Sequence, residues 1–118
     1  MVNNDVLDIK EITKPLETLQ MLSYELQGKY DIDKSLIWMT EELGEVISAI
    51  RKKYDKNEIS GEIGDLFAWI ICLCNILDIS LQDSINKTYI KELKRQQKAY
   101  GKLKYANKTF IYENEIFK

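Results

Sequence analysis

Residues that break helices are scarce throughout this chain of 118 residues, which contains one proline, Pro15, and five glycines. So few breakers over this length favour long helices over a fold of strands and turns. The hydrophobic fraction of 45% and the charged fraction of 31% are ordinary for a soluble globular protein and argue against disorder. We therefore expect one all-α domain that spans residues 1–118.

Apolar residues recur at steps of three and four positions along most of the chain, which is the periodicity of amphipathic helices. This pattern predicts helices over residues 15–27, 34–54, 58–77 and 81–100, so that the helical core covers about residues 16–100. Pro15 suits the first position of the first helix, and Gly28 and Gly101 suit helix ends. Asp33 is a good N-cap for the second helix.

The flanks of this helical core carry weaker signals. Residues 1–14 form a polar lead-in without an assigned element. Lys108–Tyr112 is compatible with a short strand or with a loop that clasps a partner chain. Between Leu66 and Leu77 the third helix is apolar nearly all round, so it is central or lies at a subunit interface. Short connections favour antiparallel neighbours, and we expect a four-helix bundle packed within and across a homo-oligomer.

Several classes of protein are excluded by composition. The chain has no histidine, so it lacks the Ser-His and Cys-His pairs of nucleophilic catalysis and the Glu-x-x-His ligands of di-iron bundles. Cys72 and Cys74 are two residues apart, which is neither a redox nor a zinc spacing. The first ten residues are too polar for a signal peptide, and the apolar run of about twelve residues is too short to cross a bilayer. We expect a cytoplasmic protein with no membrane partner.

Paired carboxylates are the most informative feature of the two central helices. Glu42 and Glu45 are three residues apart, as are Glu62 and Asp65, and each pair lies on one helix face. The face of Glu62 and Asp65 continues into large apolar residues, so these two acids are expected to point inward. Buried carboxylates must be paired with cations or must coordinate a metal. With no lysine or arginine nearby on these faces, we expect a hard cation, Mg²⁺ or Mn²⁺.

A glycine precedes the second acid of each pair, at Gly44 and Gly64. A glycine in the middle of a helix costs about 1 kcal/mol relative to alanine. Two such glycines at matched positions predict a close approach of helices beside the acids.

The acids form a larger pattern, Glu41-Glu42-Leu43-Gly44-Glu45 followed, after sixteen residues, by Glu62-Ile63-Gly64-Asp65. This pattern resembles the MazG-type nucleoside triphosphate pyrophosphohydrolases of the all-α NTP pyrophosphatase superfamily. Their signature is Glu-Glu-x-x-Glu, a gap, and then Glu-x-x-Asp. The resemblance covers about residues 16–100.

The resemblance implies a helical homo-oligomer, a dimer or a dimer of dimers, with Mg²⁺-dependent activity. It implies hydrolysis of a nucleoside triphosphate between the α and β phosphates, which yields a monophosphate and pyrophosphate in nucleotide-pool housekeeping. Carried over by position, Glu42, Glu45, Glu62 and Asp65 are metal ligands, and Glu41 is a secondary ligand or orients the attacking water. All five are therefore candidate catalytic residues.

Candidate substrate-binding residues lie elsewhere in the sequence. The family uses basic and amide residues on the following helix to hold phosphates, and Lys87, Lys91 and Asn86 are the candidates here. Trp38 lies one turn before Glu42 on the same face, where it would either stack on a base or pack inside the subunit. The pattern does not specify which base or sugar is bound.

Two other hypotheses remain open. One is a catalytically idle regulatory module that binds metal or nucleotide on the same scaffold. The other is a helical interaction protein that dimerises through its third helix, although this leaves the paired acids unexplained. Nucleic-acid binding is disfavoured: residues 86–118 carry 9 basic and 3 acidic side chains, but residues 1–85 carry 8 basic and 16 acidic ones, and the pI is about 5.2.

Overall fold

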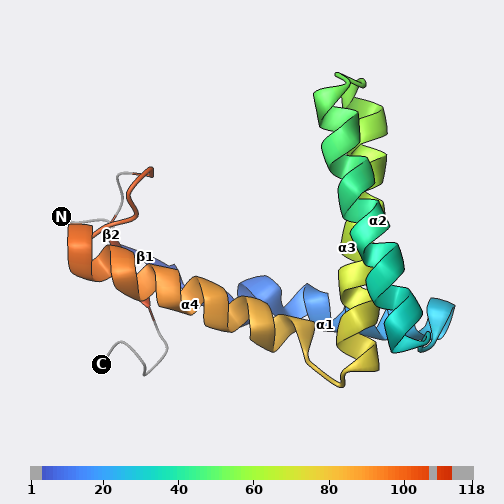
Figure 1. Ribbon diagram of the computed structural model, residues 1–118. Helices are drawn as coiled ribbons and strands as arrows, with labels where there is room; N and C mark the ends of the chain where they lie inside the picture. The colour runs from blue at the N-terminus through green and yellow to red at the C-terminus, as the bar shows by residue number, and fades with distance from the viewer. Residues whose placement is uncertain (1–3, 107–108, 113–118) are drawn as a thin grey trace. The chain divides into compact units, whose positions relative to one another are not determined.

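The computed structural model describes residues 4–106 and 109–112 of the chain. These residues form the elements β1 (Asn4–Leu7), α1 (Ile9–Gln27), α2 (Ile32–Arg51), α3 (Lys56–Ile76), α4 (Leu81–Tyr100) and β2 (Thr109–Tyr112) (Figure 1). The four predicted helices are thereby confirmed. The chain divides into two compact units, one of residues 18–81 and one of residues 1–17 with 82–118.

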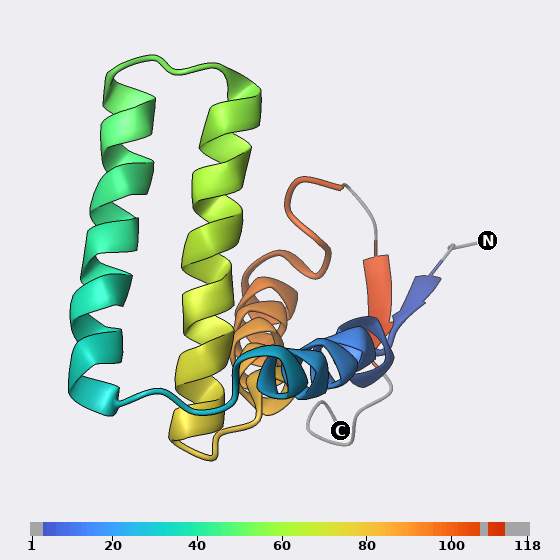
Figure 2. The same ribbon diagram turned by 90° about the vertical axis from the view of Figure 1, so that its right-hand side faces the viewer.

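In the unit of residues 18–81, α2 and α3 lie side by side and run in opposite directions (Figures 1 and 2). Each begins at an aspartate cap, because Asp31 accepts a hydrogen bond from the Lys34 N–H and Asp55 accepts one from the Glu58 N–H. The prediction of Asp33 as the cap of α2 is therefore wrong by half a turn. The tight connection between the two helices contains Lys53 with a left-handed φ of 58°.

The second half of α1 contacts the end of α3 through polar side chains. The Gln20 amide donates to the Asn75 Oδ1 at 3.1 Å and to the Ile79 carbonyl at 2.8 Å, and its Oε1 accepts from the Leu81 N–H at 2.8 Å. The apolar residues of α1 are left outside this contact, since Leu22 is 47% exposed and Leu26 is 74% exposed. Gly28 ends the helix with a φ of 63°, as predicted.

In the other unit, the first half of α1 packs on α4. Ile9 and Leu93 form its small buried cluster. The α1 helix begins at Ile9 because the Asp8 carboxylate accepts a hydrogen bond from the Glu11 N–H at 3.2 Å. Pro15 therefore lies inside the helix, and its predicted place at the first helical position is wrong.

A parallel strand pair joins the two flanks, with Asn4 opposite Thr109 and Leu7 opposite Tyr112. Of the two alternatives for Lys108–Tyr112, a strand or a loop, the structure shows a strand over Thr109–Tyr112. Lys108 lies outside the described residues. The lead-in of residues 1–14 thus contains β1 and the start of α1. A parallel pair needs a long connection between its strands, and here that connection contains all four helices. The described fold is helical apart from this strand pair.

By length and composition alone, α3 is long and apolar enough to cross a membrane. The helix has 21 residues and is therefore longer than the apolar run in its second half. Core helices of soluble proteins can have the same length and composition, so a single such helix does not identify a membrane protein. The carboxylates of Glu62 and Asp65 lie within this helix, where they meet a side chain of α2.

Candidate functional site

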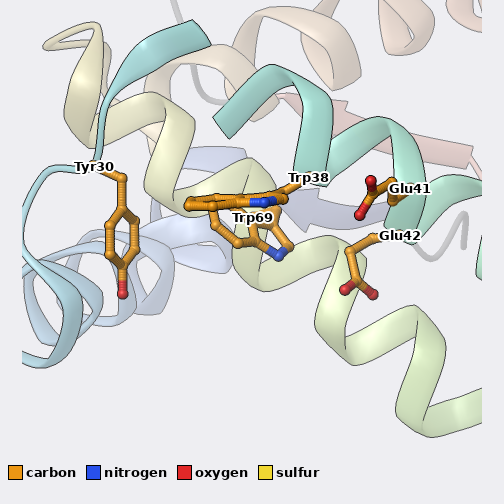
Figure 3. Close-up of a pocket in the computed structure, with 5 residues that line it drawn as sticks. All are labelled: Tyr30, Trp38, Glu41, Glu42 and Trp69. Carbon is orange, nitrogen blue, oxygen red and sulfur yellow. The ribbon is translucent and has the colours of Figure 1, made fainter. Parts of the chain in front are cut away.

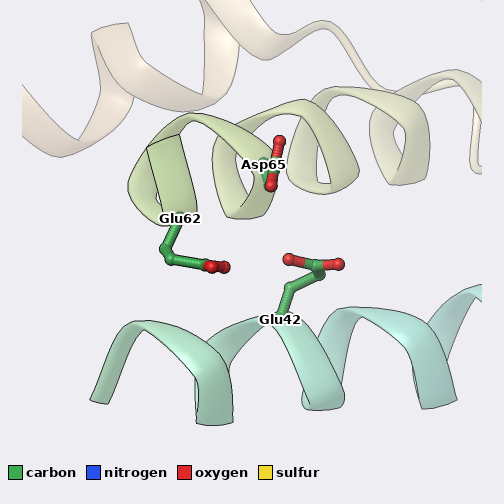
Figure 4. A group of neighbouring side chains, drawn as sticks. All are labelled: Glu42, Glu62 and Asp65. Carbon is green, nitrogen blue, oxygen red and sulfur yellow. The ribbon is translucent and has the colours of Figure 1, made fainter. Parts of the chain in front are cut away.

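The packing of α2 against α3 brings carboxylates from both helices together. Glu42 on α2 faces Glu62 and Asp65 on α3 (Figure 4). One carboxylate oxygen from each lies within 4.8 Å of one from each of the others. Glu62 and Asp65 share a face because they are three residues apart, and the antiparallel register places Glu42 opposite them. The structure thus assembles three of the four predicted metal ligands into one group.

Two of these carboxylates each have one buried oxygen without a hydrogen-bond partner among the described residues. Glu42 and Glu62 are half-buried, and the Oε2 atom of each is buried without a hydrogen-bond partner. The ion pairs Lys29–Asp78 and Arg95–Glu92 lie elsewhere. A buried, unpaired charge is costly, so a bound cation would relieve this arrangement. Asp65 is exposed at the rim, which corrects the prediction that it points inward with Glu62.

The electrostatic environment disfavours the charged forms of both half-buried acids. Burial raises the pKa of Glu42, and the charges of Glu45 and Asp65 raise it further. Burial also raises the pKa of Glu62. A hydrogen bond with Glu45 and the negative charge of Glu45 raise it further. Glu45 therefore lies close enough to act on both, although it is outside the group of three. Oxygen donors of this kind suit a hard divalent cation.

The two glycines beside the acids do not mark a close approach. A Cβ atom added at Gly44 or at Gly64 would meet nothing within 4 Å. The prediction of tight helix contact at these positions is therefore wrong within the described chain. Instead, α2 buries Val46 and Ala49, which lie on another side of the helix from Gly44.

Three aromatic rings gather next to the carboxylates. The ring centroids of Trp38 and Trp69 are 5.4 Å apart, and Tyr30 lies 6.2 Å from the first and 5.6 Å from the second. Together with Glu41 and Glu42 they line a hollow of about 390 Å³ (Figure 3). Trp38 contributes to this hollow while it also packs on another ring, so both of its predicted roles fit the geometry. Glu41 is exposed and stays outside the group of three acids.

A second hollow of about 310 Å³ adjoins the same side chains. It is lined by Gln27, Tyr30, Glu42, Asp65, Ala68 and Trp69. Glu42, Tyr30 and Trp69 border both hollows, so the acids and the aromatic rings form one continuous site. The sequence interpretation missed Tyr30 and Gln27, which stand at or beyond the end of a helix and belong to no periodic pattern. The position of Trp69 could have been predicted from the sequence, because it lies one helical turn after Asp65 on the same face.

The remaining predicted residues belong to the other unit. Lys87 and Lys91 are exposed on α4 and line a hollow of about 490 Å³ with Ile90, Lys94, Arg95 and Lys98. Arg95 is already paired with Glu92 and lowers the pKa of that carboxyl to about 2. The Asn86 Oδ1 accepts a hydrogen bond from the buried Thr13 hydroxyl at 2.6 Å, which leaves the Asn86 amide N–H groups as its remaining donors.

Comparison with known proteins places these features in a family. Residues 31–100 match the model of the MazG nucleotide pyrophosphohydrolase domain. This segment is more than half of the chain and contains all five motif acids, so the chain belongs to the MazG nucleotide pyrophosphohydrolase domain family. A domain of this family indicates nucleotide pyrophosphohydrolase activity.

One curated relative is the uncharacterized protein YpjD of Bacillus subtilis (strain 168), with 34% identity over 62 aligned residues. The alignment covers 45% of this chain and 56% of the relative, so the chain spans just over half of that protein's length. No solved structure gives a significant match to the chain.

Proposed function

We propose that this protein hydrolyses nucleoside triphosphates at the α–β phosphate bond and releases a nucleoside monophosphate and pyrophosphate. The observation that carries the proposal is the group formed by Glu42, Glu62 and Asp65, in which two buried oxygens have no hydrogen-bond partner in the described part of the chain. The family membership points to the same chemistry. Housekeeping of the nucleotide pool in the cytoplasm is the role we assign to it, without a nucleic-acid or membrane partner.

The residues of this group suit Mg²⁺, with Mn²⁺ as a possible substitute. The ligands would be Glu42, Glu62 and Asp65, joined by Glu45, whose charge acts on both buried acids. All four supply hard oxygen donors, which these cations prefer. Such a metal neutralises phosphate charge and lowers the pKa of bound water.

The chain's own side chains would orient the substrate and the attacking water. With no histidine present, a carboxylate is the natural general base, and Glu41 is exposed beside the site for this task. Trp38 and Trp69, whose rings are tilted by 48° to each other, each offer an apolar ring face on which a base could stack. Lys87, Lys91 and the N–H donors of Asn86 would bind phosphate oxygens.

We further propose that the protein works as a homo-oligomer, as a dimer or a dimer of dimers. The support is the number of large apolar side chains that the described chain leaves exposed on its helices. Examples on α2 and α3 are Ile37 at 59%, Ile47 at 49% and Ile63 at 50% exposure. Apolar surface of this extent typically marks an interaction site.

The proposal is tested by assaying pyrophosphate release from a panel of ribo- and deoxyribonucleoside triphosphates with Mg²⁺ or Mn²⁺. We expect pyrophosphate and the matching monophosphate. Glu45→Gln and Asp65→Asn should each abolish turnover while the fold stays intact, and Glu25→Gln, an exposed acid on α1, serves as the control. Release of orthophosphate would overturn the assigned bond. Turnover that survives either motif substitution would overturn the assigned metal ligands.

A different outcome would favour an idle regulatory module on the same scaffold. In that case no triphosphate is hydrolysed, yet Mg²⁺ and nucleotide still raise the thermal stability by ligand linkage. A protein whose stability responds to neither would be the plain helical interaction protein.

A further inference from the structure

Gln27 is the last residue of α1 and borders the site from outside the matched family segment. It lines the hollow of about 310 Å³ together with Tyr30, Trp69 and Asp65. Its side chain therefore shares one space with an acid of the metal group and with two aromatic rings. A polar amide in such a place is suited to contact the edge of a ring that stacks on the aromatic side chains.

A side chain of α3 contacts the oxygen end of the Gln27 amide. The thiol of Cys72, which is 2% exposed, donates to the Gln27 Oε1 at 2.7 Å. Cys72 also lies 3.8 Å from the Ser23 hydroxyl. Because the thiol has one hydrogen and directs it to Gln27, the Ser23 hydroxyl is the donor in that second contact. The result is a chain of donors that runs from Ser23 through Cys72 to the carbonyl end of Gln27.

The other end of the amide is left for a ligand. Among the residues that the structure describes, no acceptor is bonded to the Gln27 Nε2, so both of its N–H groups are available. An amide with both ends available pairs bidentately with adenine, because its oxygen accepts from the adenine amino group. Because Cys72 already donates to Oε1, the N–H groups are the part of this amide that lacks a partner among the described residues, and a carbonyl oxygen is their natural acceptor.

We propose that Gln27 determines base specificity by donating a hydrogen bond to a ring carbonyl. This inference rests on the proposed function, and it names the substrate class as nucleotides of uracil, thymine, cytosine or guanine over those of adenine. Adenine has no ring carbonyl, and its acceptor nitrogens N1 and N7 each lie next to the amino group, whose hydrogens would face the N–H groups of the amide unfavourably. Cys72 acts as a positioning residue, because it holds the amide in the donor orientation.

The test measures binding, so it does not require turnover. Trp38 and Trp69 are the two tryptophans of the chain and both line the site, so ligand binding is followed by their fluorescence. The ligands are the non-hydrolysable α,β-methylene analogues of UTP, CTP, GTP and ATP with Mg²⁺. For the wild type we expect Kd values for the three carbonyl-bearing analogues about tenfold below that for the ATP analogue, as for one net hydrogen bond.

Variants separate base recognition from a general structural effect. Gln27→Leu should raise the Kd values of the three carbonyl-bearing analogues about tenfold and leave the Kd of the ATP analogue unchanged. Cys72→Ala releases the amide and should improve ATP-analogue binding selectively, whereas Cys72→Ser keeps a donor and should retain the wild-type preference. Glu25→Gln, on an exposed position of α1, should change none of the four values.

The outcomes distinguish the two proposals. A wild type without base preference, or a Gln27→Leu variant weakened equally for all four analogues, would overturn the role of Gln27 and leave the proposed hydrolysis standing. A wild type whose fluorescence responds to none of the analogues would overturn the nucleotide site and the role of Gln27 together. Turnover of ATP at the same kcat/KM as of the other triphosphates would also refute the base specificity.

Discussion

Replacing Glu42 by glutamine should separate the fold of this protein from its metal site. Glu42 is the α2 member of the group, and it faces both acids of α3. The substitution keeps the shape of the side chain and removes a charge whose buried oxygen has no partner. We therefore expect the metal-free variant to be at least as stable as the wild type and to lose most of its response to Mg²⁺.

The size of that response follows from ligand linkage and chain length. At a Mg²⁺ concentration of 100 times Kd, binding stabilises the wild type by about 2.7 kcal/mol. A chain of this length has an unfolding entropy of roughly 250 cal/mol/K, so the melting temperature rises by about 11 °C. If the loss of Glu42 weakens binding 100-fold, the same concentration contributes only about 0.4 kcal/mol, or about 2 °C.

Differential scanning fluorimetry or calorimetry across a Mg²⁺ titration measures both shifts. Glu25→Gln removes one exposed carboxylate from α1 and should keep the full Mg²⁺ response. A Glu42→Gln variant that is strongly destabilised without metal, or that responds to Mg²⁺ like the wild type, would refute the metal-site argument. Circular dichroism confirms that the helices are intact in each variant.

Other perturbations test separate parts of the structure. Because the folded-state pKa values of Glu42 and Glu62 are raised above their ordinary value, these two carboxyls should make the metal-free protein more stable as pH falls from 7 toward 5 in urea denaturation, and saturating Mg²⁺ should reverse that trend. Gly44→Ala should raise the unfolding free energy by about 1 kcal/mol, since a Cβ meets open space there. Gly28→Ala should lower it by about 1 kcal/mol, because its φ is 63°. Asp31→Ala should cost about 1 kcal/mol by removing the cap of α2. Unchanged denaturation midpoints would contradict these three expectations.

Local sequence signals were sufficient to predict the helices and the pairing of acids on one face of each helix. The α4 helix spans Leu81–Tyr100 and stops at Gly101, as its periodicity and the glycine predict. The starts of α1 and α2 differ from the predicted ones, because Asp8 and Asp31 cap these helices at earlier positions than the sequence analysis expected. A cap depends on which of several nearby aspartates adopts the required backbone angles, and periodicity does not contain that information.

The strand pair shows a limit of a different kind. β1 and β2 lie at opposite ends of the chain and pair with each other only because the fold brings the flanks together. Each is four residues long, which is too short for a clear alternation of apolar and polar positions. Neither flank contains a signal for its partner.

The sequence by itself determined the chemistry available to this protein. The chain has no histidine and carries acids three residues apart on two helices, so carboxylates are the charged ligands that it can offer a hard cation, and helix geometry alone puts each pair on one face. The tertiary structure decided which acids meet, because the rotation of α2 against α3 brings Glu42 to Glu62 and Asp65 and leaves Glu41 outside. It also brought Tyr30 and Gln27 to the same site. Contacts across elements depend on packing angles and register, which residues far apart in the chain set together.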